Sequence, residues 1–231
     1  MEMNGLLLFV HRCFFLAALV GLTWVGQVAY GAADFDRLLA SIPQRWGIGV
    51  SVRFVAWQTL LQGLRNETDS TKLKKINDFF NRQILFGEDA AVWGQPDYWA
   101  TPLETLGRGS GDCEDFSIAK YYSLKEVGVA SDKLRLIYVR AKVGTTDAVA
   151  SQAHMVLAYY AQADAEPLVL DNLINDIRPA SRRTDLVPVF SFNSEGVFTG
   201  ISGKEVTPAA GTGRLSRWED LLKRARAEGF E

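Results

Sequence analysis

The stretch Gly109-Ser110-Gly111-Asp112-Cys113-Glu114-Asp115-Phe116 joins a glycine-rich loop to a helix, and it decides the fold. From Phe116 onward, apolar side chains recur at helical spacing as far as Gly128, a residue type that commonly ends helices. Cys113 therefore lies where this helix begins. The unpaired N–H groups and partial positive charge of a helix N-terminus favour thiolate over thiol. The same N–H groups can hold an oxyanion when a thiolate attacks a carbonyl.

The segments before this helix are themselves mostly helical in pattern. Apolar residues at helical spacing predict a helix from residue 34 that Pro43 interrupts, with helix-compatible sequence continuing over Val50–Leu64. Thr71–Leu85 carries a clear amphipathic stripe. Val92–Arg108 is rich in Trp, Tyr, Gly and Pro, and we expect an ordered loop there.

The segments after the helix alternate between strand-like runs and connections. We expect strands over Leu134–Val143, His154–Tyr160, Leu168–Leu173, Pro188–Phe192 and Gly196–Thr199, loops over Thr145–Gln152 and Ala161–Pro167, and a terminal helix over Trp218–Ala227. Helices followed by a cysteine-bearing helix and an antiparallel sheet predict an α+β fold.

Composition excludes several classes of protein. The 231 residues are 48% hydrophobic and 23% charged, which is typical of globular proteins and not of disordered chains. A net charge of −2 argues against a general nucleic-acid binder. With only 2 Cys and 2 His, a four-ligand zinc site of Cys and His would need all of them, at spacings that no zinc motif has.

The N-terminus carries an export signal. An uncharged stretch, residues 13–33, follows Arg12 and ends in small residues that suit a cleavage site. The stretch is also long enough to span a bilayer, so residues 1–33 are either a cleaved signal peptide or a retained anchor, and 34–231 form the domain. No second spanning segment follows. The domain then has one cysteine, Cys113, and one histidine, His154. A lone thiol in an exported protein is either needed for its chemistry or is a buried, inert residue.

His154 and Asp171 are the candidates to act with Cys113. His154 opens one predicted strand and Asp171 lies at the end of the next. Adjacent antiparallel strands can place an imidazole beside a thiol and a carboxylate beside that imidazole, as general base and orienting group require. Taken singly, a strand-edge histidine and a turn aspartate are better explained as structural residues, but all three fall at element edges, where active sites form.

The strings Gly111–Phe116, Ala153–Leu157 and Leu170–Asn172, in this order and together with Trp99–Leu106, resemble the bacterial transglutaminase-like cysteine proteinases, and within them the LapG family. The resemblance covers most of the chain after residue 34. It implies a papain-like α+β core and a Cys113, His154, Asp171 triad. It also implies a periplasmic protease that cleaves a large repeat adhesin near its N-terminus, at a paired-alanine site, and so controls biofilm attachment. An inner-membrane cyclic-di-GMP receptor of the LapD type is then the sequestering partner.

Three carboxylates crowd the cysteine. Asp112, Glu114 and Asp115 would oppose a thiolate by like-charge repulsion, and a bound cation would remove that conflict. The resemblance implies Ca²⁺ bound by Asp112, Glu114 and Asp115, and carboxylate oxygens suit that ion. The spacing is not that of an EF-hand, and carboxylates stabilised by the helix dipole are the alternative explanation.

Two other functions compete with the protease. The same triad could perform cell-wall peptide hydrolysis or acyl transfer, because one fold supports several reactions. A silent binding module is the third class, against which the intact Cys, His and Asp argue. The chain also contains a paired alanine of its own within Thr207–Gly213, a predicted exposed turn that another molecule of the protease could cleave.

Overall fold

The computed structural model describes residues 42, 45–47, 50–145, 148–199 and 212–230. Contacts divide the chain after residue 30, and every described residue lies in the second part, residues 31–231. The predicted export segment, the helix expected from residue 34 up to Ser41, and most of the paired-alanine segment lie outside the described residues. Within the described ranges, no helix combines the length and apolar character that a membrane crossing requires.

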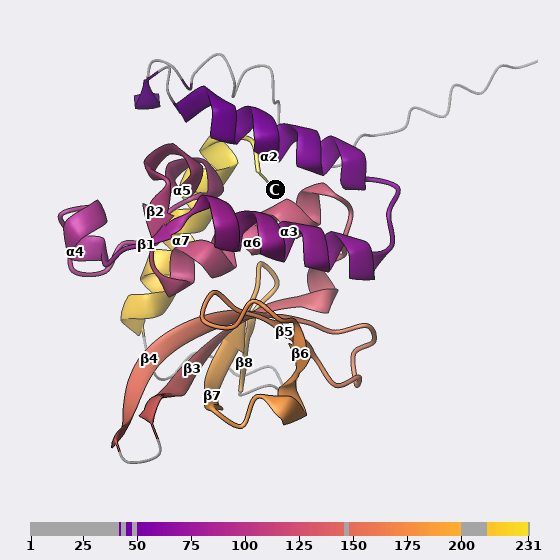
Figure 1. The fold of residues 1–231 in the computed structure, drawn as a ribbon, viewed down its shortest axis with the longest axis vertical. Helices are drawn as coiled ribbons and strands as arrows, with labels where there is room; N and C mark the ends of the chain where they lie inside the picture. The colour runs from indigo at the N-terminus through magenta and orange to yellow at the C-terminus, as the bar shows by residue number, and fades with distance from the viewer. Residues whose placement is uncertain (1–41, 43–44, 48–49, 146–147, 200–211, 231) are drawn as a thin grey trace, which may run out of the picture. The chain divides into compact units, whose positions relative to one another are not determined.

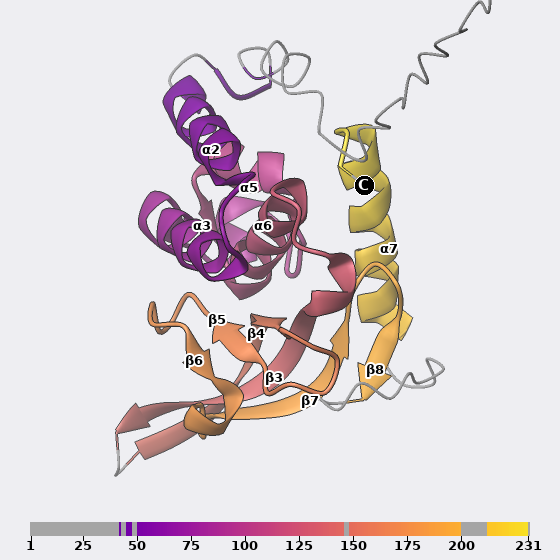
Figure 2. The ribbon, with the colours of Figure 1, turned by 90° about the vertical axis from the view of Figure 1, so that its right-hand side faces the viewer.

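Helices and an antiparallel sheet form two layers, so the predicted α+β class is confirmed (Figures 1 and 2). The helices are α2 (Ser51–Leu64), α3 (Asp69–Gln83), α4 (Asp89–Val92), α5 (Pro102–Arg108), α6 (Cys113–Glu126) and α7 (Thr212–Ala227), with single 3₁₀ turns η2 (Ser131–Lys133) and η3 (Ala180–Arg182). The strands are β1 (Leu85–Phe86), β2 (Ser110–Gly111), β3 (Leu134–Thr145), β4 (Ala148–Tyr159), β5 (Leu168–Leu170), β6 (Arg178–Pro179), β7 (Leu186–Phe192) and β8 (Val197–Thr199).

The main sheet has six strands in the order β6-β5-β4-β3-β7-β8, and each neighbouring pair is antiparallel. Strand alternation sends Leu134 and Leu136 of β3 into the core beneath the helices, whereas Ile137 and Val139 join a second apolar cluster. Both faces of the central strands are thus apolar. In Figures 1 and 2 the helices α2, α3, α5 and α6 lie together on one side of this sheet.

Helix α6 is the central helix of the core. It is buried along nearly its whole length, which explains why its apolar residues do not gather on one face only. Polar groups on it are satisfied inside the protein: Trp57 Nε1 donates to Ser123 Oγ at 2.9 Å. The Ser117 hydroxyl donates to the carbonyl of Met155 in β4 at 3.1 Å. The Ser117 bond ties the N-terminal part of α6 to β4, and the Trp57 bond ties its C-terminal part to α2.

The predicted loop over Val92–Arg108 is wrong in part, because residues 102–108 form α5. Pro102 stands in the first turn of this helix, where its missing N–H costs nothing. The Thr101 hydroxyl and the Glu104 side chain cap each other's backbone N–H groups, and the helix ends at Gly109 in the left-handed conformation at φ 69°. The proline therefore begins a helix here.

The predicted loop over Thr145–Gln152 is also wrong, because β4 already begins at Ala148 and pairs with β3 along its full length. His154 consequently lies in the middle of a strand and does not open it. The small and polar residues before His154 have little strand preference of their own, and pairing with the neighbouring strand overrides it. The remaining predicted strands are found within two residues of their expected ends, except that β5 already ends at Leu170, and the C-terminal helix begins at Thr212, six residues before its predicted start.

Candidate active site

Cys113 is the first residue of α6, and the short strand β2 delivers the chain to it. Asp112 is extended, with φ −102°, and the helix begins at the next residue. The chain packs tightly here, because a Cβ atom added at Gly111 would come within 2.5 Å of an Asp115 carboxylate oxygen. Glycine at 111 thus lets the turn into α6 pass directly beside Asp115.

His154 and Asp171 are both 1% exposed and hydrogen-bonded to each other. Asp171 directly follows β5, which pairs with β4 only from Leu157 to Tyr159. His154 Nε2 lies 2.8 Å from Asp171 Oδ1, which also accepts the Leu173 N–H at 3.0 Å. Because this bond occupies Nε2, Nδ1 is the ring nitrogen left for another partner.

One cavity of about 280 Å³ is lined by both Cys113 and His154. Its walls include the apolar side chains of Phe86, Tyr138 and Leu173. The structure therefore brings the predicted nucleophile and base to the same cavity, with the predicted orienting carboxylate bonded to the base.

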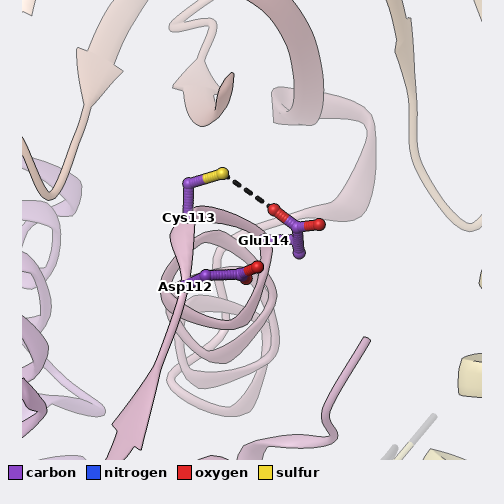
Figure 3. A group of neighbouring side chains, drawn as sticks. All are labelled: Asp112, Cys113 and Glu114. Carbon is purple, nitrogen blue, oxygen red and sulfur yellow. Dashed lines mark hydrogen bonds between the residues drawn. The ribbon is translucent and has the colours of Figure 1, made fainter. Parts of the chain in front are cut away.

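The thiol hydrogen bond, however, goes to a carboxylate. Cys113 Sγ donates to Glu114 Oε2 at 2.7 Å, and Figure 3 shows the two side chains turned toward each other at the start of α6. Burial, and next the charge of Glu114, raise the pKa of the Cys113 thiol above its ordinary range, although a hydrogen bond from the Met155 N–H acts in the opposite direction. Cys113 is thus a protonated thiol in this arrangement.

Five carboxylates meet beside Cys113: Asp89, Asp97, Asp112, Glu114 and Asp115. Ligand oxygens of Asp89, Asp112 and Asp115 lie within 4.8 Å of one another, as do those of Asp89, Asp97 and Glu114. Buried oxygens of Asp89, Asp97 and Asp112 find no hydrogen-bond partner among the described residues. Such orphaned oxygens at this spacing suit a hard cation.

The raised pKa values of these carboxylates also favour a cation site. Burial, and then the charge of Glu114, raise the pKa of Asp112 to about 10. Burial also raises the pKa of Asp89 to about 6, although the Tyr98 N–H bonded to it counteracts this. Asp115 has a pKa well above its ordinary value because it is fully buried, even though the Ala100 N–H donates to it at 2.8 Å. A divalent cation among these groups would compensate their charge.

Residues 59–186 match the family described as bacterial transglutaminase-like cysteine proteinase BTLCP. The chain belongs to this family. It is a cysteine protease by that membership. The structure is similar to that of Legionella pneumophila LapG, with 37% sequence identity, a TM-score of 0.68, and coverage of 84% of this chain and 98% of the LapG chain.

Two further LapG structures carry information about calcium. Calcium-bound L. pneumophila LapG has a TM-score of 0.67 at 37% identity and covers 82% of this chain and 98% of its own. EGTA-treated LapG has a TM-score of 0.70 at the same identity, over 84% of this chain and 98% of its own. No curated protein gives a significant match.

Of the predicted calcium ligands, Asp112 lies close to Glu114 in one group of ligand atoms and close to Asp115 in another, whereas Glu114 and Asp115 do not share a group. Sequence reasoning missed Asp89 and Asp97, which lie in α4 and in the loop after it. They reach the cysteine because the parallel pair of β1 and β2 lays residues 85–87 beside residues 109–111. Nothing in the periodicity of the chain signals so short a pair.

Proposed function

We propose that this chain is a calcium-dependent periplasmic cysteine endopeptidase that cleaves a large surface adhesin near its N-terminus, at a paired-alanine site, and so controls biofilm attachment. The observation that carries the proposal is the cavity shared by Cys113 and His154, with His154 bonded to Asp171. Membership of the proteinase family and the 37% identity to LapG over most of both chains support it.

The proposed reaction uses the three residues as nucleophile, base and orienting group. His154 Nδ1 takes the thiol proton as the Cys113 sulfur attacks the scissile carbonyl, while Asp171 holds the tautomer with the proton on Nε2. N–H groups at the start of α6 are placed to stabilise the oxyanion. The imidazolium then gives its proton to the leaving amine, and an acyl-enzyme forms. Water, deprotonated by His154, releases the acyl group and restores the thiol.

In this proposal Glu114 is both the hydrogen-bond acceptor of the Cys113 thiol and a ligand of the calcium ion. In the structure its carboxylate accepts the thiol hydrogen bond and so competes with His154 for that proton. Calcium, when bound, would supply positive charge among Asp89, Asp97, Asp112, Glu114 and Asp115. If the Glu114 oxygens were engaged as calcium ligands, Glu114 would no longer accept the thiol hydrogen bond, and the Cys113 proton would be available to His154.

Part of the cavity lining is apolar and open to a substrate. Phe86, Tyr138 and Leu173 line the cavity together with Cys113 and His154, and the rest of the lining includes carboxylates proposed to hold calcium. Phe86 is 55% exposed and Leu173 is 47% exposed, so both can contact an incoming chain. The proposed preference for a pair of alanines rests on the resemblance to LapG.

The location and partners follow from the N-terminal sequence and the family resemblance. The apolar segment over residues 13–33 supports export to the periplasm, and any membrane contact would be made through it if it is retained. An inner-membrane cyclic-di-GMP receptor of the LapD type is the proposed sequestering partner, and the adhesin is the proposed substrate.

The deciding experiment incubates the purified protein with the N-terminal region of a candidate adhesin. Wild-type protein with calcium should cut it once, at the alanine pair, and a chelator should stop the reaction until calcium is restored. Cys113→Ala and His154→Ala should leave the adhesin intact, because nucleophile and base act as a unit. Cleavage by Cys113→Ala at the wild-type rate would refute the proposal, and cleavage indifferent to chelator would refute its calcium part.

A further inference from the structure

Arg183 is a buried arginine that contacts the proposed triad. It follows η3, and only 3% of it is exposed. Its Nη2 donates to Asp171 Oδ2 at 2.7 Å and to Asp185 Oδ2 at 2.8 Å. Burying a guanidinium costs free energy that an apolar side chain of similar volume would not, so packing alone gives no reason for arginine here.

The two oxygens of Asp171 have different partners. Oδ1 accepts hydrogen bonds from His154 Nε2 and from the Leu173 N–H, and Oδ2 accepts from Arg183. The last torsion of an aspartate side chain is broad and soft, so one hydrogen-bonded oxygen alone does not fix the plane of the carboxylate. With donors on both oxygens the plane is fixed, and Oδ1 is aimed at His154.

The guanidinium is in turn held by Asp185. Arg183 Nε donates to Asp185 Oδ1 at 3.0 Å, while Nη2 donates to Oδ2, which is the paired geometry that an arginine fork allows. The backbone of Asp185 is itself anchored, because its carbonyl accepts the Lys142 N–H at 2.8 Å. The orientation of Asp171 is thereby tied to strand β3.

We infer that Arg183 is a positioning residue of this proteinase, which holds His154 in the orientation for taking the Cys113 proton by fixing Asp171. The inference rests on the proposed triad. Among the described residues, Arg183 does not line the cavity that holds Cys113 and His154, so it acts through Asp171. Lys120 of α6 is a second basic side chain near Asp171, but burial lowers its pKa to about 7, so Arg183 supplies the permanent positive charge at this carboxylate.

The test uses iodoacetamide, a small thiol reagent, so that it does not depend on the identity of the substrate. The full chain carries Cys13→Ser, which leaves Cys113 as its only cysteine. With calcium present, Arg183→Met should slow alkylation of Cys113 by about 10- to 100-fold, the scale of a 1 Å misplacement in a catalytic group. Arg182→Met, at the exposed position beside it, is the matched control and should react at the wild-type rate.

A double-mutant cycle separates positioning from general structural support. In an Asp171→Asn background, Arg183→Met should slow alkylation by less than about threefold, because the group through which Arg183 acts has already been changed. An equal slowing in both backgrounds, or none in the wild-type background, would overturn the inference. All rates are compared below the melting temperature of each variant. If Arg183→Met does not fold, Arg183→Lys, which keeps the charge and loses the fork, takes its place in the same cycle.

The same alkylation assay tests the proposed triad before any Arg183 variant is compared. If the wild-type thiol reacts no faster than that of His154→Ala, Cys113 is not activated by His154, and the triad and the Arg183 inference fail together. If His154→Ala and Asp171→Asn slow the reaction but Arg183→Met does not, the triad stands and only the inference about Arg183 falls.

Discussion

Lys120 is a charged residue in the middle of the core, and replacing it should change how stability depends on pH. The residue is 1% exposed, and its Nζ lies 5.8 Å from the centre of the Phe116 ring. Burial lowers the pKa of Lys120 from 10.5 to about 7, although the charge of Asp171 acts in the opposite direction. The folded protein therefore holds the Lys120 proton much less tightly than the unfolded chain does.

The direction of the effect follows from this difference. Between pH 7 and pH 10.5 the unfolded chain binds the Lys120 proton and the folded protein does not, so the free energy of unfolding rises with pH in this window. Below the pKa of Lys120 in the folded protein, Lys120 is charged in both the folded and the unfolded state, and the folded protein carries the full free-energy cost of burying that charge. The shift corresponds to about 5 kcal/mol in total, at about 1.4 kcal/mol for each pH unit. Lys120→Met removes this contribution while keeping a side chain of similar length.

The assay is urea unfolding of the wild type and Lys120→Met at several pH values between about 7 and 10, with calcium in excess. Lys120→Met should be the more stable protein near pH 7, and its advantage should shrink by about 1.4 kcal/mol per pH unit toward pH 10. Lys75→Met, at an exposed position of α3, controls for the general effect of exchanging lysine for methionine. A difference between wild type and Lys120→Met that does not vary with pH would refute the reasoning.

Three further predictions concern the architecture around the cysteine. Gly111→Ala should lower both the melting temperature and the calcium affinity measured by titration calorimetry, because the new methyl group would displace Asp115. An unchanged calcium affinity would show that Asp115 is not a calcium ligand. Thr101→Ala should cost about 1 kcal/mol in urea unfolding through loss of the cap of α5, and no loss would show that the cap contributes nothing. Phe86→Ser should reduce adhesin cleavage with little change in stability. Leu85 is the exposed neighbour of Phe86 and does not line the cavity, so Leu85→Ser should leave cleavage unchanged. Equal effects of the two substitutions on cleavage would exclude Phe86 as a substrate contact.

The parts of the fold that were predicted correctly depend on local patterns. The apolar spacing after Phe116 locates α6, and the amphipathic stripe over Thr71–Leu85 locates α3 within two residues at either end. The order of a helix bearing Cys113, then His154, then Asp171 predicts a meeting of the three around one sheet, and the structure places them so. Each signal is contained in a short window, so no tertiary contact is needed to detect it.

The parts that were missed depend on contacts between distant segments. Pro102 looks like a helix breaker unless the cap formed by Thr101 and Glu104 is recognised. Arg183 reaches Asp171 only because the chain turns back after β6, and no spacing rule links an arginine to an aspartate 12 residues before it. The acidic cluster likewise needs the pairing of β1 with β2 to bring Asp89 beside Asp112.

The sequence shows Asp112 and Glu114 beside Cys113 but leaves open whether the helix or the carboxylates have the larger effect on the thiol. A helix N-terminus favours a thiolate by about 0.3–1 kcal/mol, and by about 2 kcal/mol in the best partly buried cases. A single carboxylate about 4 Å from a thiolate opposes it by about 4 kcal/mol at an effective dielectric constant of about 20. Glu114 lies closer than that, 2.7 Å from the sulfur, and Asp112 adds to its effect. The carboxylates therefore outweigh the helix, and α6 alone cannot keep Cys113 ionised. A reactive thiolate at this position needs a counter-charge, which the proposed divalent cation at Asp112 and Glu114 would supply together with the imidazolium of His154.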